Sequence, residues 1–220
     1  MIERTNAVFR DTNSKAVIAQ ILAVAFPEIK SISDLTYGKG AFWFGHPDST
    51  DSPLYHAGIR LVPLDRHPRY GCLIEADARY VPLKDGAVDL VIFDPPHQHG
   101  ISKTTTLQHQ ADFGRMPNQR DIHQLLIDAI PEVRRVARVG AIIKLTDMVE
   151  AGRFMPTHML FAAGVASTLG WPCDMAILDS GVVRPMKPNQ RVLHLRQAHS
   201  YFLIYKWQER EPRSPFWEVH

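Results

Sequence analysis

The chain contains no run of eighteen consecutive apolar residues, so a transmembrane helix is not expected. Residues 1–6 lack the apolar stretch of a secretory signal peptide. Cys72 and Cys173 are the two cysteines, too few for a disulfide framework, and a reducing compartment is the simpler interpretation. The net charge is only +2, which by itself does not indicate a polyanionic partner. These absences predict a cytoplasmic protein without a membrane span.

The apolar content is sufficient for one complete α/β domain. The 220 residues are 45% hydrophobic, which is enough to bury a full core. No internal repeat or low-complexity tract divides the sequence. We therefore expect a single domain over residues 1–220, with its core at about residues 15–207 and a polar tail at 208–220.

Apolar periodicity predicts helices at residues 14–26, 122–136 and 159–169, the last two closed by Gly140 and Gly170 at C-cap positions. A short apolar strand is expected to end at Asp34. Further strands are expected at residues 59–64, 72–76, 88–93, 141–145, 175–178 and 201–205. Residues 45–58 are rich in Pro, Gly, His and Asp, and they predict a loop or a short helix.

The tetrapeptide Asp94-Pro95-Pro96-His97 directly follows the apolar run at 88–93. Its two prolines remove two N–H donors and fix two φ angles, so the Asp94 carboxylate and the Pro95 carbonyl can be held as rigid acceptors. Two acceptors that face one point suit a group with two N–H bonds, such as the exocyclic amine of adenine or cytosine. His97 offers a flat ring for stacking on the base. The alternative interpretation is an ordinary turn at the end of a strand.

A second motif lies upstream, where the expected strand ends at Asp34 and a loop with Gly38 and Gly40 follows. Glycines in such a loop let the backbone approach a ligand closely, where a Cβ would clash. One G-x-G by itself is a weak nucleotide signal. Its combination with the downstream tetrapeptide makes the signal strong.

Two segments carry this combination: Tyr37-Gly38-Lys39-Gly40 with Phe42-Trp43, and Phe93-Asp94-Pro95-Pro96. They resemble motifs I and IV of the S-adenosylmethionine-dependent amino-methyltransferases of nucleic acid bases, especially small bacterial and phage DNA methyltransferases. The resemblance implies a Rossmann-like class I methyltransferase fold, an α/β fold with a seven-stranded, mostly parallel sheet and helices on both faces. It also implies methylation of N6 of adenine or N4 of cytosine in DNA, with Asp94, Pro95, Pro96 and His97 as the catalytic motif. The family usually has tyrosine where this chain has His97.

Acidic residues follow four of the expected strands, at Asp34, Asp65, Asp77 and Asp94. Ligands of open parallel sheets bind outside the carboxyl ends of the strands, so these side chains predict a rim that collects hydrogen-bond donors. S-adenosylmethionine offers an amino group, two ribose hydroxyls and an adenine amine, and its sulfonium cation is favoured by acidic surroundings.

The resemblance assigns roles along this rim. Asp34 and the glycine loop would hold the methionine end of S-adenosylmethionine, Asp65 the ribose diol and Asp77 the adenine. For both Phe42 and Trp43, a core role is an alternative of at least equal weight to packing against the cofactor. The predicted cofactor-binding residues are Asp34, Thr36, Tyr37, Gly38, Gly40, Phe42, Asp65, Asp77, Ala78 and Asp94.

Two basic segments, residues 97–120 and 180–198, are candidates for contacts with nucleic acid phosphates. For the second segment, a solvated hairpin is an alternative of similar weight. A metal site is not expected, because the histidines of the first segment match no zinc pattern and no cysteine is nearby. The predicted nucleic-acid-binding residues are Lys103, Arg115, Arg120, Arg184, Lys187 and Arg191.

Three alternatives stay open at this stage. The first is methylation of a base amine in RNA, although no RNA-binding module is evident. The second is a catalytically silent nucleic-acid-binding partner with the same fold. A nicotinamide dehydrogenase is the third and is disfavoured, because the third glycine of that fingerprint is absent. Separate target-recognition domains are also absent, so specificity is expected in loops or in a second subunit, either another copy in a homodimer or a specificity subunit.

Overall fold

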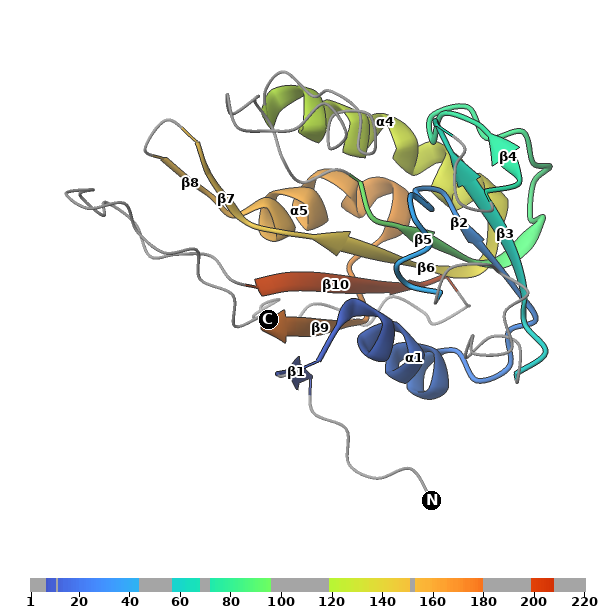
Figure 1. The fold of residues 1–220 in the computed structure, drawn as a ribbon. Helices are drawn as coiled ribbons and strands as arrows, with labels where there is room; N and C mark the ends of the chain where they lie inside the picture. The colour runs from blue at the N-terminus through green and yellow to red at the C-terminus, as the bar shows by residue number, and fades with distance from the viewer. Residues whose placement is uncertain are drawn as a thin grey trace, which may run out of the picture.

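The computed structural model describes residues 7–10, 12–43, 57–67, 72–95, 119–150, 153–179 and 199–207. Its helices are α1 (Ser14–Ala25), α4 (Gln119–Val136) and α5 (Thr157–Leu169) (Figure 1). None of the helices in these ranges is both long and apolar enough to span a lipid bilayer. The strands are β1 (Val8–Phe9), β2 (Ser31–Asp34), β3 (Arg60–Asp65), β4 (Ile74–Glu75), β5 (Val88–Phe93), β6 (Ala137–Leu145), β7 (Met148–Glu150), β8 (Arg153–Met155), β9 (Asp174–Asp179) and β10 (His199–Lys206).

One sheet organises the molecule, with the strand order β1-β9-β10-β6-β5-β2-β3-β4. Strands β6, β5, β2, β3 and β4 pair in parallel, whereas β10 runs antiparallel to both of its neighbours. The predicted Rossmann-like class I fold is confirmed. The sheet has eight strands rather than seven, because β1 pairs in parallel with the edge strand β9.

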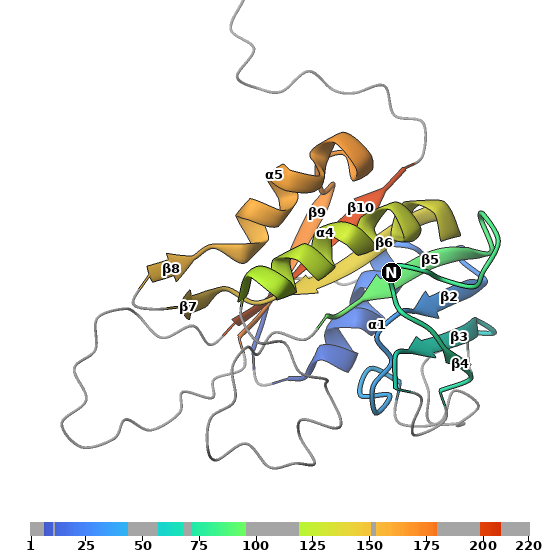
Figure 2. The same cartoon turned by 90° about the horizontal axis from the view of Figure 1, so that it is seen from above.

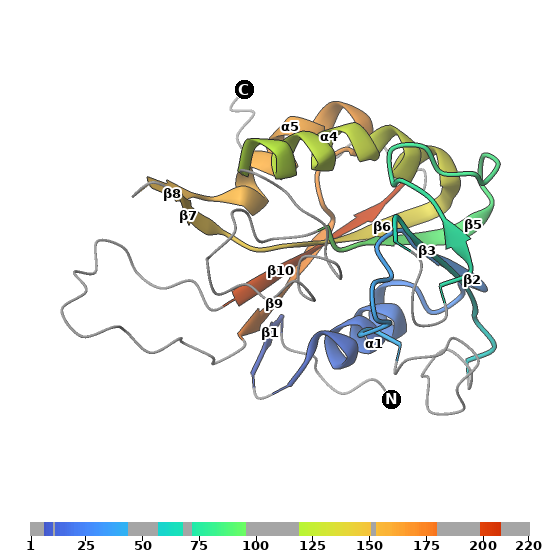
Figure 3. The same cartoon turned by 45° about the horizontal axis from the view of Figure 1, so that its top comes forward.

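The helices cover both faces of the sheet. Helices α4 and α5 pack side by side on one face, and α1 lies on the other (Figures 2 and 3). The core is accordingly divided into two apolar clusters. Phe93 of β5 belongs to the cluster under α4 and α5, whereas Ile92 belongs to the cluster under α1. A strand covered on both faces needs apolar residues at successive positions, which explains the apolar run at residues 90–93 of β5.

Most predicted elements are present with small shifts at their ends, but the cap assigned to Gly140 was wrong. Strand β6 begins directly after α4, so Gly140 lies inside the strand, opposite Leu90 and Lys206. A Cβ at Gly140 would collide with the Tyr205 carbonyl oxygen and come within 2.9 Å of the Phe26 ring. Close approach of neighbouring chain segments therefore explains this glycine. The second predicted cap is confirmed, because Gly170 has a φ of 75° and its N–H donates to Ala166 of α5.

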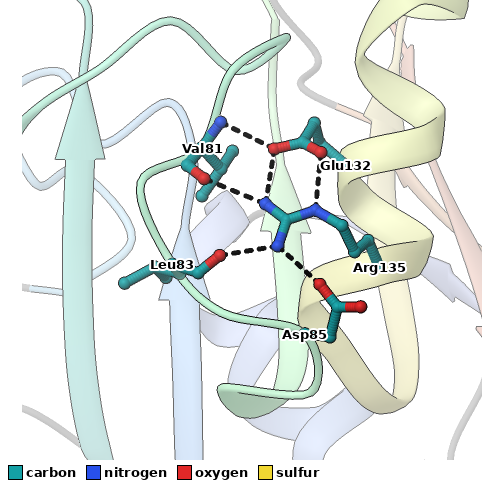
Figure 4. Close-up of polar contacts among 5 residues, drawn as sticks. All are labelled: Val81, Leu83, Asp85, Glu132 and Arg135. Carbon is teal, nitrogen blue, oxygen red and sulfur yellow. Dashed lines mark hydrogen bonds and ion pairs between the residues drawn. The ribbon is translucent and has the colours of Figure 1, made fainter.

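Arg135 near the end of α4 anchors the turn that leads into β5 (Figure 4). Its guanidinium donates to the carbonyl oxygens of Leu83, at 2.6 Å, and Val81, at 2.9 Å. It also pairs with Glu132 and Asp85, and Glu132 accepts from the Val81 N–H. Charge-assisted hydrogen bonds to two carbonyls fix the turn against the helix. The entry of the chain into β5 is thereby fixed.

Asp89 joins the amino end of β5 to the amino end of its neighbour β2. One oxygen of its carboxylate accepts hydrogen bonds from the Lys30 N–H, at 2.8 Å, and from the N–H and hydroxyl of Ser31, both at 3.0 Å. The other oxygen accepts from Arg138. This cluster holds β2 beside β5 at the end of the sheet opposite Asp34 and Asp94.

Some expectations fall outside the described residues. Of the predicted loop at residues 45–58, only residues 57 and 58 are described, and they form a turn. The predicted polar tail at 208–220 also lies outside the described part of the chain. Residues 148–155 contain the β7–β8 hairpin, which the apolar pattern did not predict.

Candidate functional site

The carboxyl ends of β2 and β5 bring Asp34 and Asp94 to the same edge of the sheet. Strands β2 and β5 are hydrogen-bonded neighbours, with Asp34 opposite Ile92. From β2 the chain continues outward to β3 and β4, whereas β5 is followed by β6 on the other side. This is the topological switch point of a doubly wound sheet, where such folds bind their ligands.

Asp34 is buried and shapes the loop that follows it. Its side chain is 1% exposed. One carboxylate oxygen accepts from the Thr36 N–H at 3.0 Å, and the other accepts from Trp43 Nε1 at 2.7 Å. The pKa of Asp34 is raised to about 7, because burial outweighs the two hydrogen bonds that lower it and the nearby charges of Asp94 and Asp65 add to the rise. Trp43 itself is fully buried and is the donor that closes the loop.

The glycine loop is joined to the end of β3. The Gly38 N–H donates to Asp65 Oδ2 at 2.8 Å, and the Tyr37 N–H donates to the Leu64 carbonyl at 3.0 Å. Gly38 and Gly40 have φ angles of 55° and 68°, a region that residues with a Cβ rarely adopt. Both glycines are therefore required by the turn itself. The structure places the loop and Asp65 together, as the sequence predicts.

Asp94 is connected to this loop by its backbone and to β6 by its side chain. Its N–H donates to Thr36 Oγ1 at 2.7 Å. Its Oδ2 accepts from Lys144 Nζ at 2.9 Å, and the following residue, Pro95, is buried. Two of the predicted site residues, Thr36 and Asp94, thus join the two sequence motifs directly.

Lys144 was missed by the sequence analysis. The available signal was a single lysine in the otherwise apolar run of residues 141–145. Its ammonium nitrogen lies 5.4 Å from the centre of the Phe42 ring, within the range of a cation–π contact. Phe42 is 6% exposed and packs edge-on against Trp43. Phe42 therefore takes part in the core, and it also contacts the Lys144 cation beside Asp94.

Asp77 follows β4 at the same edge, but its carboxylate is engaged by a neighbour. Arg79 donates to both oxygens, at 2.9 and 2.7 Å. These hydrogen bonds hold the pKa of Asp77 below its usual value. Ala78 is partly buried and packs against the core under α4 and α5. The predicted adenine contact of Asp77 stays a prediction.

Other predicted site residues are not tested by the structure. The backbone of Arg120 lies in α4, but its side chain is not described. Within the described ranges, no group of three or more His, Cys, Asp or Glu residues is arranged to hold a metal ion. The predicted residues outside the described part of the chain are Pro96, His97, Lys103, Arg115, Arg184, Lys187 and Arg191.

The raised pKa of Asp34 predicts a pH-dependent stability. The folded chain holds this proton more tightly than the unfolded chain, because the pKa is about 7 when folded against a usual 3.8. The stabilisation is complete below about pH 4 and is lost as the pH rises through 7. We expect the wild type to lose about 2–3 kcal/mol relative to Asp34→Asn between pH 5 and pH 8. Urea denaturation of both chains at both pH values measures this. If the free energy of unfolding changes equally for both chains between pH 5 and pH 8, Asp34 is ionised across this range.

No protein-family model and no curated protein matches the chain. Among solved structures, the PH0226 protein from Pyrococcus horikoshii is 14% identical, with a TM-score of 0.46 over 89% of this chain and 92% of the other. A candidate DNA modification methylase from Thermus thermophilus, solved with S-adenosyl-L-methionine, is 21% identical, with a TM-score of 0.40 over 65% of this chain and 55% of the other.

A tRNA methyltransferase from Aquifex aeolicus is 11% identical, with a TM-score of 0.46 over 92% of this chain and 73% of the other. These values are too low to assign a cofactor, a reaction or a substrate to this chain. Any assignment therefore rests on the residues of the site.

Proposed function

We propose that this chain transfers a methyl group from S-adenosylmethionine to an exocyclic amino nitrogen of a DNA base, N6 of adenine or N4 of cytosine. One observation supports the proposal above all others. Asp94 and Pro95 lie at the carboxyl end of β5, and the Asp94 N–H is bonded to Thr36 of the adjacent glycine loop at 2.7 Å. The two residues that we assign as acceptors for the amine therefore follow directly on the backbone contact with a loop suited to a nucleoside cofactor.

The residues of the site fit S-adenosylmethionine. Its amino group, ribose hydroxyls and adenine amine are donors, and the partly exposed carboxylates of Asp65 and Asp77 lie at the carboxyl ends of the adjacent strands β3 and β4. Among the described residues, a Cβ built on Gly38 meets one atom within 4 Å, the Thr36 carbonyl oxygen at an ordinary 3.8 Å. A ligand can therefore approach the Gly38 backbone. When bound, the cofactor supplies an electrophilic methyl group on a positively charged sulfur.

The acceptors near β5 explain the choice of an amine as target. An exocyclic base nitrogen is a poor nucleophile, since its lone pair is delocalised into the ring. The Asp94 carboxylate and the Pro95 carbonyl would accept its two N–H bonds and favour a tetrahedral nitrogen with an available lone pair. Asp94 and Pro95 would hold the amine while the methyl group passes from sulfur to nitrogen, and Asp94 would accept the proton that the nitrogen then loses. Positioning and charge stabilisation supply most of the rate.

In duplex DNA the target base must leave the helix before it reaches Asp94. Unstacking and unpairing cost about a few kcal/mol. We assign stacking of the extruded base to His97, which follows Asp94 by three residues. Transfer of labelled methyl to matched DNA and RNA pools tests the choice of DNA. Faster labelling of RNA would replace DNA as the substrate without changing the site.

Cofactor binding is tested by Gly38→Val. Valine at a φ of 55° is strained and places a side chain over the loop, so we expect affinity for S-adenosylmethionine to fall at least about tenfold. The matched control is Gly58→Val. Gly58 has a similar φ of 64°, with no atom within 4 Å of a built Cβ, and it precedes β3 at the opposite end from the site. Calorimetry that gives equal affinities for the two variants would contradict the assigned cofactor site.

A further inference from the structure

Lys144 places a positive charge inside a central strand of the sheet. Its side chain is 14% exposed, and that of its partner Asp94 is 19% exposed. Strand β6 is otherwise apolar at the neighbouring positions, with Ile143 and Leu145 fully buried. A buried ammonium is costly unless it is paired, and here it meets the Asp94 carboxylate at 2.9 Å and the face of Phe42 at 5.4 Å.

The partners of this ammonium define a cation site. Phe42 comes from the glycine loop, and Asp94 comes from the end of β5. An aromatic face together with a carboxylate attracts any compact cation, and a sulfonium is one such cation. We propose that Lys144 is the built-in cation of this site, and that its charge weakens binding of S-adenosylmethionine relative to its uncharged thioether product, S-adenosylhomocysteine. This inference rests on the proposed function.

The argument follows from the distances that methyl transfer requires. The target nitrogen must lie about 2.6–3.2 Å from Asp94, and the methyl carbon about 3–3.5 Å from that nitrogen. With the methyl–sulfur bond added to these two distances, the sulfonium is within roughly 8 Å of the carboxylate that Lys144 contacts. Lys144 Nζ lies 2.9 Å from Asp94 Oδ2, so the ammonium and the sulfonium are within roughly 11 Å of each other, where two like charges still repel measurably at the dielectric of a protein surface. The thioether carries no charge, so Lys144 does not repel it.

The consequence concerns the balance between cofactor and product. Without a bound cofactor, the Lys144 ammonium offsets the charge of Asp94, which lies near the carboxyl groups of Asp34 and Asp65. The arriving sulfonium must either displace the ammonium or bind beside it. Both routes disfavour the charged cofactor, and neither affects the product. Lys144 is thus a residue that sets the ratio of the two affinities.

The experiment compares wild type, Lys144→Met and Lys144→Arg by calorimetry, with S-adenosylmethionine and S-adenosylhomocysteine at one pH and low salt. We expect Lys144→Met to shift the affinity ratio toward S-adenosylmethionine by about three- to thirtyfold. Lys144→Arg keeps the charge and should leave the ratio near that of the wild type. Lys144→Gln is a second uncharged variant that can still donate to Asp94, and it should shift the ratio in the same direction.

Thermal unfolding of every variant shows which of them are folded. An unchanged ratio in a folded uncharged variant would overturn the inference and leave Lys144 as a structural tie between β5 and β6. A different result bears on the proposed function itself. If the wild type binds neither compound, the cofactor assignment falls, and the inference about Lys144 falls with it.

Discussion

Replacing Asp94 by alanine should lower the rate of methyl transfer by about 10²- to 10⁴-fold, while affinity for S-adenosylmethionine changes much less. The carboxylate is an acceptor for the target amine, so its hydrogen bond matters most as the nitrogen becomes tetrahedral. Asp34 and Asp65 organise the cofactor loop through separate hydrogen bonds. The backbone N–H of residue 94, which donates to Thr36, is retained in the variant.

Single-turnover rates at saturating cofactor, together with calorimetric affinities, separate these two effects. A matched control is Asp128→Ala in α4, a carboxylate that accepts from Gln124 on the exposed surface. The control should transfer methyl groups at the rate of the wild type. If Asp94→Ala is as fast as the wild type, the carboxylate is a turn residue and the assigned active site is wrong.

Gly140→Ala should destabilise the fold by more than about 3 kcal/mol. The added methyl would collide with the backbone carbonyl of Tyr205 in the neighbouring strand β10, and it would press on the Phe26 ring at 2.9 Å. Both neighbours are buried, so the collision cannot be relieved by a movement into solvent. The free energy of unfolding in urea, compared with that of the wild type, measures the effect.

A glycine-to-alanine substitution in a helix provides the control. Gly164 lies in α5, and a Cβ built there meets the Ile127 side chain at an ordinary 3.5 Å. Gly164→Ala should therefore gain roughly 0.5–1 kcal/mol from helix propensity and a less flexible unfolded chain. Equal stability of Gly140→Ala and the wild type would mean that β6 and β10 are farther apart than in this structure.

The sequence predicted the sheet because its strands are short, apolar and followed by acidic residues. Strand β5 is buried on both faces, so its residues 90–93 are all apolar and its end before Asp94 is easy to recognise. Asp34 is equally visible as the end of β2. Parallel strands have their carboxyl ends at one edge, so the order of motifs was enough to place these carboxylates together.

Contacts between distant segments could not be predicted in the same way. Gly140 has the sequence features of a helix cap, and only its approach to Tyr205, 65 positions later, explains the glycine. The pairing of Lys144 with Asp94 depends on how β6 and β5 align, with Ile143 opposite Phe93. Local patterns carry no information on such an alignment.

Two further details depend on side-chain geometry rather than on pattern. Trp43 was an equal candidate for cofactor or core contact, and the structure shows it fully buried with its indole N–H on Asp34. Arg79 donates to both oxygens of Asp77, a contact that the pattern did not predict, and the adenine contact of Asp77 stays a prediction. Both contacts depend on side-chain rotamers, which the packed environment fixes and a local sequence pattern does not show.

The most direct test of the proposed function is the identity of the methylated nucleoside. DNA incubated with the chain and labelled S-adenosylmethionine is digested to nucleosides and analysed by mass spectrometry. We predict label on N6 of adenine or N4 of cytosine, with the signal lost in Asp94→Ala and retained in Asp128→Ala. Label on a ring carbon, or no label on DNA or RNA while the cofactor binds, would contradict the account.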